Sequence, residues 1–260
     1  MKPTPIYLDK KDCLPLAVYE SNEAMGLAAA LEAREIIQQA LAERNEANLI
    51  LASGNSQLTF LNELSKLDGI DWSKVHIFHM DEYLGLEPDH PASFPAFLRH
   101  HIIDAVHPGA FFPIPGRAED AEKTCQEYEA LLRRHPADLV ALGIGESGHL
   151  AFNDPPDALF FDPAWVKIVH LPFLARRQQV GEGHFQTLDD VPVRAITLTI
   201  PSLLAARHVL CIVPEARKAD IVRASLLQPV SEDVPGSILR TIRHVQLYLD
   251  RESAAKVYPV

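Results

Sequence analysis

Cysteine is scarce in this sequence, and long hydrophobic segments are absent. Its three cysteines, Cys13, Cys125 and Cys211, are odd in number and form no Cys-x-x-Cys pair. This argues against a disulfide framework and against a cysteine-based metal site. No apolar run approaches the roughly 20 residues that span a membrane, and the N-terminal Met-Lys-Pro-Thr-Pro lacks the pattern of a signal or transit peptide. We therefore expect a protein of the reducing cytoplasm that does not bind a membrane.

Positive charge is also scarce. Lysine and arginine number 24 against 35 aspartates and glutamates, which gives a formal net charge of −11. Such a surface argues against nucleic acid as the main partner, and an anionic ligand would need a local positive site. Hydrophobic residues make up 47% of the chain, and no low-complexity tract or linker interrupts it. The sequence thus predicts one domain over residues 1–260.

Helical and apolar strand patterns alternate along most of the chain. Strands that are apolar throughout and separated by helices are typical of a mostly parallel sheet covered on both faces. We therefore predict a single α/β domain with an open, Rossmann-like sheet and helices on both sides. The predicted strands are residues 48–52, 75–79, 138–142, 166–171, 195–199, 208–213 and 245–249, and the predicted helices are residues 22–42, 57–67, 93–105, 118–134 and 216–227.

The most informative segment is the glycine-rich loop after the strand at 138–142. Residues 143–155 read Gly-Ile-Gly-Glu-Ser-Gly-His-Leu-Ala-Phe-Asn-Asp-Pro, and glycines such as Gly145 and Gly148 allow a sharp turn. The loop carries His149 and, shortly after it, Asp154. Open α/β sheets usually bind ligands where such loops leave the strands, and an imidazole can transfer protons near neutral pH. The alternative is a tight turn with a structural histidine.

Phosphate-binding residues are predicted at the start of two helices. Backbone N–H groups and the helix dipole favour an anion there. Lys218, at the start of the helix at 216–227, is a cation that opposes the dipole, which suggests phosphate capture. The alternatives are ordinary turn residues and a solvated lysine. The first of the two helices follows the turn Ser53, Gly54, Asn55 and Ser56.

Two adjacent carboxylates, Asp81 and Glu82, follow the strand at 75–79. Burial and a neighbouring like charge both raise the pKa of a carboxyl group toward the range of a general base. The alternative is a solvated pair at a strand end.

A further segment, residues 174–191, is polar and contains Arg176 and Arg177. It is either a mobile lid or a surface connection.

Taken in order, these motifs resemble the glucosamine-6-phosphate deaminase (isomerase) family, whose fold is shared with 6-phosphogluconolactonases. The resemblance extends from about Ser21 to Lys256. It depends on Met80-Asp-Glu-Tyr83, on Gly143-x-Gly-x-x-Gly-His149 and on Ala151-Phe-Asn-Asp-Pro155. Lactonases typically follow Gly-His with a Thr-Ala-Ser-Leu-Phe-Pro type of run, so the third motif favours the deaminases.

The resemblance implies an isomerising deaminase of the hydrolase class. It would convert glucosamine 6-phosphate, or an epimer, to a ketose 6-phosphate and ammonia. His149 would open the sugar ring, and Asp81 would carry a proton from C2 to C1 through an enolamine. Neither a metal nor an organic cofactor is expected, because the substrate's own carbonyl accepts the electrons. A homo-oligomer is possible. The other implied catalytic residues are Glu82, Glu146, Ser147 and Asp154, and those implied for the substrate and its phosphate are Ser53, Gly54, Asn55, Ser56, Gly145, Gly148, His184 and Lys218.

Four features depart from the family pattern. Glu182-Gly183-His184-Phe185 lies where classical members carry a phosphate-binding arginine. Ser147 stands where the family often has an Asp or Asn that orients the histidine, and the neighbouring Glu146 is a candidate substitute. Asp154 replaces a glutamate and is one methylene shorter. Trp165 stands at the position of an allosteric arginine, so activation by N-acetylglucosamine 6-phosphate is not expected. Ser147 and Asp154 fit either a changed substrate or weakened catalysis.

Two other functions remain open at this point. One is a sugar-phosphate lactonase on the same fold. The other is a sugar-phosphate sensor without catalysis, of the kind that regulates transcription. A sensor of that kind needs a DNA-binding helix-turn-helix and a basic surface, for which the short segment before the first predicted helix leaves no room. The presence of both Asp81 and His149 favours catalysis.

Overall fold

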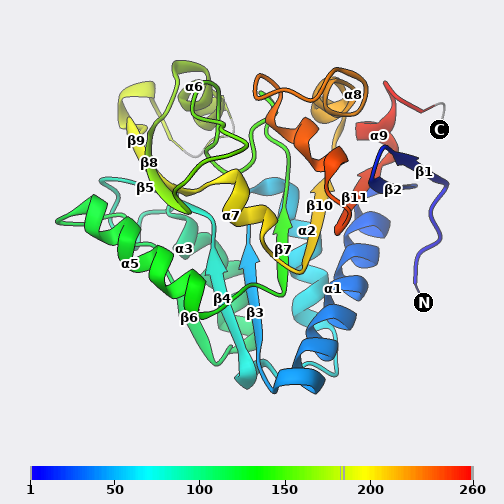
Figure 1. The fold of residues 1–260 in the computed structure, drawn as a ribbon, viewed down its shortest axis with the longest axis horizontal. Helices are drawn as coiled ribbons and strands as arrows, with labels where there is room; N and C mark the ends of the chain where they lie inside the picture. The colour runs from blue at the N-terminus through cyan, green and yellow to red at the C-terminus, as the bar shows by residue number, and fades with distance from the viewer. Residues whose placement is uncertain (1, 182, 184, 259–260) are drawn as a thin grey trace.

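An eight-stranded sheet forms the centre of the computed structural model, which describes residues 2–181, 183 and 185–258 (Figure 1). Neighbouring strands pair in parallel except for β1 and β2, so the predicted mostly parallel sheet is confirmed. The order across the sheet is β1 (Tyr7–Lys11), β2 (Leu14–Tyr19), β11 (Val245–Asp250), β10 (His208–Val213), β7 (Leu139–Leu142), β3 (Ala47–Leu51), β4 (Val75–His79) and β6 (Ala110–Phe112).

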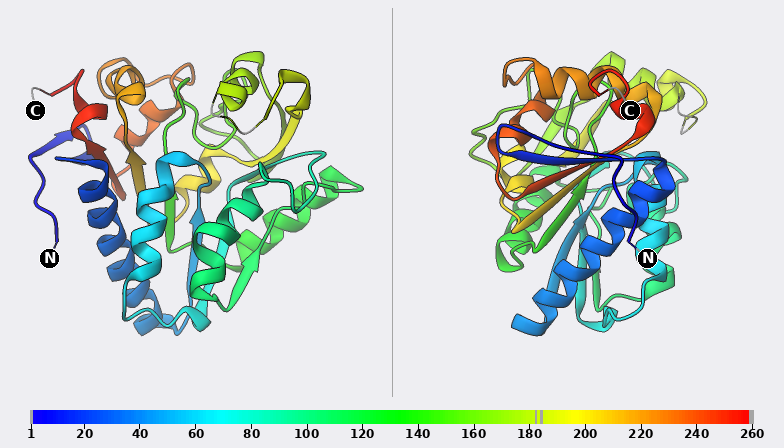
Figure 2. Two further views of the ribbon diagram at one scale, coloured as in Figure 1. Left: turned by 180° about the vertical axis from the view of Figure 1, so that it is seen from behind. Right: turned by 90° about the vertical axis from the view of Figure 1, so that its right-hand side faces the viewer.

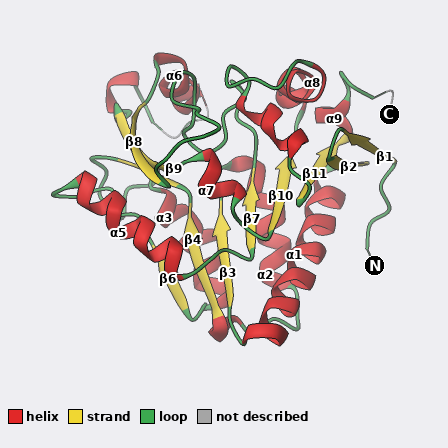
Figure 3. Ribbon diagram, in the orientation of Figure 1, coloured by secondary structure: helices red, strands yellow, loops and turns green. Residues whose placement is uncertain are grey.

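Helices cover both faces of this sheet (Figures 2 and 3). The first helix begins as predicted, because the Ser21 side chain accepts a hydrogen bond from the Ala24 N–H. One face carries α1 (Asn22–Arg44), α2 (Leu58–Lys66) and α3 (Phe94–Leu98), the last continued by a π-helical segment (Arg99–Ile103) and α4 (Asp104–Val106). The other face carries α5 (Ala121–Arg134), α7 (Ile200–Leu204) and α8 (Ala219–Leu227).

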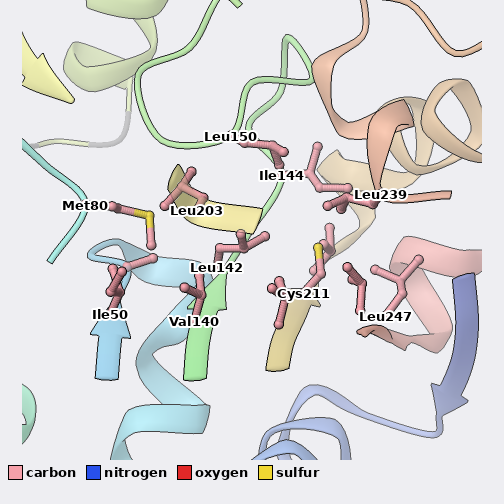
Figure 4. Close-up of a cluster of buried hydrophobic side chains, with 14 of the residues drawn as sticks. Ile50, Met80, Val140, Leu142, Ile144, Leu150, Leu203, Cys211, Leu239 and Leu247 are labelled. Atoms are coloured by element: carbon pink, nitrogen blue, oxygen red, sulfur yellow. The ribbon is translucent and has the colours of Figure 1, made fainter. Parts of the chain in front are cut away.

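The apolar strands supply two separate cores because successive side chains of a strand point to opposite faces. In β3, Leu49 and Leu51 pack beneath α1 and α2, whereas Ile50 packs on the opposite side. Val140 and Leu142 of β7 lie with Ile50 on that second side (Figure 4). Burial on both faces therefore explains why these strands show no alternation of polar and apolar residues.

A second, three-stranded sheet is the main departure from the prediction. It pairs β5 (Asp81–Tyr83), β9 (Arg194–Leu198) and β8 (Val166–His170) in antiparallel fashion. The assignment of residues 166–171 and 195–199 to the large parallel sheet was therefore wrong. The chain leaves the large sheet at Met80, and the Met80 carbonyl accepts a hydrogen bond from the Leu198 N–H at 2.7 Å. Strand β5, expected as part of a loop, thus starts a new sheet.

Smaller elements also differ from the prediction. The short strands β1, β2 and β6 and the helix α7 were not predicted, and residues 173–181 of the expected lid or connection include α6 (Phe173–Gly181). A final short helix is α9 (Arg251–Ala254). In the part of the chain that the structure describes, no helix has both the length and the apolar composition needed to cross a bilayer. The 3₁₀ segments are η1 (Asn55–Gln57), η2 (Trp72–Lys74), η4 (Leu188–Asp190), η5 (Ala216–Lys218) and η6 (Pro235–Thr241).

Helix α5 is fixed to the end of β4 by a buried polar contact. The Tyr128 hydroxyl donates to the carbonyls of His79 and Phe112, at 3.0 and 3.1 Å, and accepts from the His79 N–H at 3.1 Å. The His79 ring is fully buried, and its Nε2 accepts from the Ile114 N–H at 2.7 Å. Burial lowers the pKa of His79 to about 3, so its imidazole is neutral. This network fixes the strand that leads to Asp81.

Replacing Tyr128 by phenylalanine should therefore destabilise the fold. The buried carbonyls and N–H group would lose their shared partner, at a cost of about 1–3 kcal/mol. Urea unfolding should show a lower midpoint with an unchanged slope. Tyr7→Phe, at a position that is 38% exposed, is the matched control and should change the midpoint little. Equal midpoints for Tyr128→Phe and the native protein would contradict this account.

Candidate active site

A pocket opens where the strand order of the large sheet reverses, between β3 and β7. Successive connections run outward through β4 and β6 on one side of this point and through β10 and β11 on the other. Loops leaving adjacent strands diverge at such a point, which is where open α/β sheets bind ligands. The pocket is lined by Ala52, Ser53, Gly54, Asn55, Ser56, Met80, Asp81, Pro91, Ala92, Ser93, Phe94, Phe97, Gly143, Ile144, Gly145, His149, Ala151, Phe152, Gln179, Arg217 and Lys218.

The loop after β3 contributes all four of its predicted residues, 53–56, to the pocket. The loop is anchored by Gln57, whose Nε2 donates to Ser56 Oγ at 3.1 Å and to the Ile212 carbonyl at 3.3 Å. Gly54 has a φ of +129°, which disfavours any residue with a side chain. The Ser53 hydroxyl is buried and has no hydrogen-bond partner among the described residues. The loop therefore offers an unused hydroxyl and a glycine backbone to a ligand.

Two cations face this loop from the segment after β10. Lys218 is only 4% exposed, and both Lys218 and Arg217 line the pocket. Arg217 Nη1 lies 3.0 Å from Glu146 Oε1, and its Nε lies 2.5 Å from Glu215 Oε2. Lys218 was predicted as a phosphate-binding residue. Arg217, its neighbour in the sequence, was not predicted to belong to the site. The pocket thus contains two cationic side chains where an anionic ligand would need positive charge, and one of them, Arg217, already pairs with carboxylates.

The Asp81–Glu82 pair is buried, which excludes the solvated alternative. Asp81 lines the pocket, and burial together with the neighbouring charge of Glu82 raises its pKa well above the usual range. Glu82 points elsewhere: its carboxylate accepts hydrogen bonds from the Ser93 hydroxyl at 2.8 Å and from the Tyr83 N–H at 2.7 Å. Burial still raises the pKa of Glu82 to about 7. Glu82 is not among the residues that line the pocket, because the alternation of β5 turns its side chain away from Asp81. Its predicted catalytic role stays a prediction.

His149 also lines the pocket, and two side chains lie close to its ring nitrogen Nδ1. Nδ1 lies 2.8 Å from Ser147 Oγ and 3.3 Å from Asp154 Oδ1, and Ser147 Oγ donates to the same Asp154 oxygen at 2.5 Å. Burial would raise the pKa of Asp154, but the hydrogen bonds and the charge of His149 hold it below its usual value. The three side chains form a connected group in which Asp154 and Ser147 orient the imidazole.

Gly145 permits this placement of the imidazole. A Cβ atom at position 145 would lie 2.0 Å from His149 Nε2 and 2.1 Å from Cε1, so no other residue fits without moving the ring. Gly148 has a different role. Its φ is +92°, and a Cβ there would face Ile221 and Pro235. Of these two glycines, Gly145 lines the pocket and Gly148 is not among the lining residues, so a ligand contact of Gly148 stays a prediction.

Glu146 was a candidate to take the place of the residue that orients the histidine, but its side chain has another partner. Its carboxylate pairs with Arg217, and Asp154 already reaches His149. Within the segment 174–191, Gln179 of α6 lines the pocket. Arg176 instead donates to the carbonyls of Val191 and Leu188 and so closes its own segment. The predicted ligand residue His184 lies outside the residues that the structure describes.

Comparison with known sequences gives consistent matches over most of the chain. A family model described as glucosamine-6-phosphate isomerases/6-phosphogluconolactonase matches residues 20–248. A glucosamine-6-phosphate deaminase of Exiguobacterium sibiricum is 35% identical over 223 residues, covering 85% of this chain and 86% of the relative. A glucosamine-6-phosphate deaminase of Streptococcus gordonii is 34% identical over 239 residues, covering 92% and 96%.

Solved structures give similar matches. A monomeric glucosamine-6-phosphate deaminase superimposes with a TM-score of 0.84 at 28% identity, covering 93% of this chain and 99% of the other. A 6-phosphogluconolactonase from Shewanella baltica superimposes with a TM-score of 0.72 at 22% identity, covering 90% and 96%. The second likeness is one of fold.

The buried acidic pair should make the stability of the protein depend on pH. Because folding raises the pKa of Glu82 from 4.5 to about 7, the folded state binds this proton more tightly. The free energy of unfolding should therefore fall as the pH rises from about 4.5 through 7. In Glu82→Gln this decrease should shrink by about 1–3 kcal/mol, as measured by urea unfolding between pH 5 and 8. The exposed Glu127→Gln is the control, and an unchanged pH dependence in Glu82→Gln would refute the assignment.

Proposed function

The chain belongs to the glucosamine-6-phosphate isomerase/6-phosphogluconolactonase family, and we propose that it is a deaminase of hexosamine 6-phosphates. It would convert glucosamine 6-phosphate, or an epimer, to a ketose 6-phosphate and ammonia. The observation that carries this proposal is the convergence of Asp81 and His149 on one pocket that also holds a cationic, glycine-containing anion site. The free thiols of all three cysteines fit the cytoplasm, where we propose that the enzyme acts.

The substrate phosphate would lie between the loop 53–56 and the two cations. The unpartnered Ser53 hydroxyl would donate to a phosphate oxygen, and the glycine backbone at 54 allows close approach. Lys218 and Arg217 would supply the positive charge against a protein whose net charge repels anions. Binding the phosphate at this end directs the sugar carbons toward Asp81 and His149.

Ring opening would be catalysed by His149. The imidazole takes the proton of the C1 hydroxyl and delivers a proton to the ring oxygen as the bond from C1 to that oxygen breaks. Asp154 and Ser147 hold Nδ1, so Nε2 is the atom left for this transfer. The product is the open-chain aldehyde with an ammonium group at C2.

The isomerisation would depend on Asp81. Its carboxylate takes the proton of C2, and the electrons pass to the C1 carbonyl oxygen. That oxygen takes a proton from the C2 ammonium group, which gives a neutral enolamine. Asp81 then returns its proton at C1 while the nitrogen lone pair forms the C=N bond of the ketimine at C2. A carboxylate with a raised pKa binds the transferred proton firmly and keeps it from solvent. The substrate ammonium favours the ionised form of Asp81, so the base is generated in the bound complex. Water then hydrolyses the ketimine at C2 and releases ammonia, which is the hydrolytic part of the reaction.

The deaminase reaction is preferred here to lactone hydrolysis. Relatives named glucosamine-6-phosphate deaminase, such as those from Exiguobacterium sibiricum and Streptococcus gordonii, are 34–35% identical to this chain over most of its length. The likeness to a lactonase structure at 22% identity concerns the fold. A buried carboxyl group in the same pocket as an imidazole also suits proton transfer between carbons, a step that the opening of a lactone does not contain.

Release of ammonia from a panel of hexosamine 6-phosphates tests the proposal. Glucosamine 6-phosphate or one of its epimers should yield ammonia and a ketose 6-phosphate in equal amounts. Asp81→Asn should lower kcat by roughly 10²–10⁴, because the base is lost while the shape is kept. The exposed Asp104→Asn is the matched control and should retain activity. Hydrolysis of 6-phosphogluconolactone without ammonia release from any amino sugar would replace the deaminase by a lactonase.

Arg217 should contribute to binding more than to chemistry. In Arg217→Met the substrate phosphate would lose a charge-assisted contact, which is worth about 1.5–3 kcal/mol. We expect KM to rise by roughly 10- to 100-fold and kcat to change by less than about threefold. Inorganic phosphate should also become a weaker competitive inhibitor. Arg223→Met changes an exposed arginine of α8 and is the control; an unchanged KM in Arg217→Met would remove this residue from the phosphate site.

A further inference from the structure

We propose that Glu46, His76 and His135 form a binding site for a divalent transition metal, best suited to Zn²⁺. Their potential ligand atoms all lie within 4.8 Å of one another. Glu46 Oε1 is 3.9 Å from His76 Nδ1 and 3.7 Å from His135 Nδ1. Two imidazoles and one carboxylate form a donor set that zinc commonly takes, with a fourth position left for another oxygen.

The three residues come from separate elements at the amino end of the central strands. Glu46 lies between α1 and β3, His76 is in β4, and His135 follows the last turn of α5. In Figure 1 the amino ends of β3 and β4 lie at the bottom of the sheet, whereas the pocket is formed by loops at their carboxyl ends. A metal here would therefore connect the two strands to α5 without touching the substrate.

The surroundings already orient these ligands. Asn48 Nδ2 donates to Glu46 Oε1 at 3.0 Å and to the Pro136 carbonyl at 3.3 Å, which fixes the carboxylate. Such outer hydrogen bonds are typical of metal sites. Asn48 Oδ1 lies 3.1 Å from His76 Nδ1. It becomes a neighbouring oxygen donor once a metal displaces the proton on that nitrogen.

The two imidazole rings also pack against each other and against the ring of Phe112. They meet edge to face, with ring centroids 5.4 Å apart, and both pack against Phe112 at 5.7 to 6.1 Å. The side chains of His76 and His135 are 21% and 20% exposed, so an ion can enter from solvent. Ligands at 2.0–2.1 Å from a tetrahedral zinc lie about 3.3 Å apart. The present separations thus need only modest side-chain rotation.

Titration of the metal-free protein with Zn²⁺ and Co²⁺ tests this site. After treatment with a chelator, calorimetry should show one equivalent of bound Zn²⁺, and Co²⁺ should give the visible absorption bands of a tetrahedral complex. Zinc at about a hundred times its Kd should raise Tm by roughly 5–10 °C. Calorimetry, absorption and Tm need no activity assay, so the metal-binding result does not depend on whether the proposed function holds. If the enzyme releases ammonia from glucosamine 6-phosphate, the rate should be the same with and without the metal.

Variants locate the ion. His76→Gln and His135→Gln should each weaken Zn²⁺ binding at least about tenfold, and Glu46→Gln provides a third variant that keeps both aromatic contacts. His100→Gln is the control for a surface histidine, and His149→Gln is the control for the pocket; both should bind Zn²⁺ as the native protein does. Undiminished single-site binding in all three ligand variants, loss of binding only in His149→Gln, or no stoichiometric binding at all would overturn the proposal.

Discussion

The burial of Asp81 and Glu82 is the constraint on which the rest of the site depends. Burial of two adjacent carboxyl groups disfavours their ionisation, and the structure keeps both groups buried because the chain from Met80 to Tyr83 is bound to β9. The Met80 carbonyl accepts a hydrogen bond from the Leu198 N–H where the chain leaves the large sheet. In the small sheet, Asp81 of β5 is paired with Thr197 of β9. The small sheet therefore has a clear physical role: it holds a carboxylate in the pocket that solvent would otherwise surround.

The His149 loop shows how a shortened side chain is accommodated. The family pattern has a longer acid at position 154. Asp154 here still lies 3.3 Å from His149 Nδ1, and the Ser147 hydroxyl lies within hydrogen-bond distance of both groups. Serine brings no charge, but it fixes the carboxylate oxygen that faces Nδ1. The pair Ser147 and Asp154 thus acts as one orienting unit.

Local sequence patterns predicted individual strands, helices and loops better than they predicted the contacts between them. Strand 75–79 was predicted to the residue, and the loop 53–56, Asp81, His149 and Lys218 meet in one pocket as expected, because parallel strands bring their carboxyl ends to one edge. The second sheet was not predictable in this way, since the apolar runs at 166–171 and 195–199 look alike whichever sheet they join. Arg217 was missed because an arginine beside a lysine is ordinary on a surface. The group Glu46, His76 and His135 has no spacing signature, since only the fold brings its members together.

Strand β4 and the residues that follow it show how the position of a side chain along a strand determines its chemical role. His76, near the start of the strand, is partly exposed and lies close to Glu46. His79, at its end, is buried, accepts a hydrogen bond from the Ile114 N–H and is held neutral. Asp81, just beyond, is buried too, but at the wall of a pocket, so a bound cation can restore its charge. The same short stretch therefore supplies a candidate metal ligand, a structural acceptor and a base. The surroundings that the tertiary fold provides, and not the residue types alone, assign each of these roles.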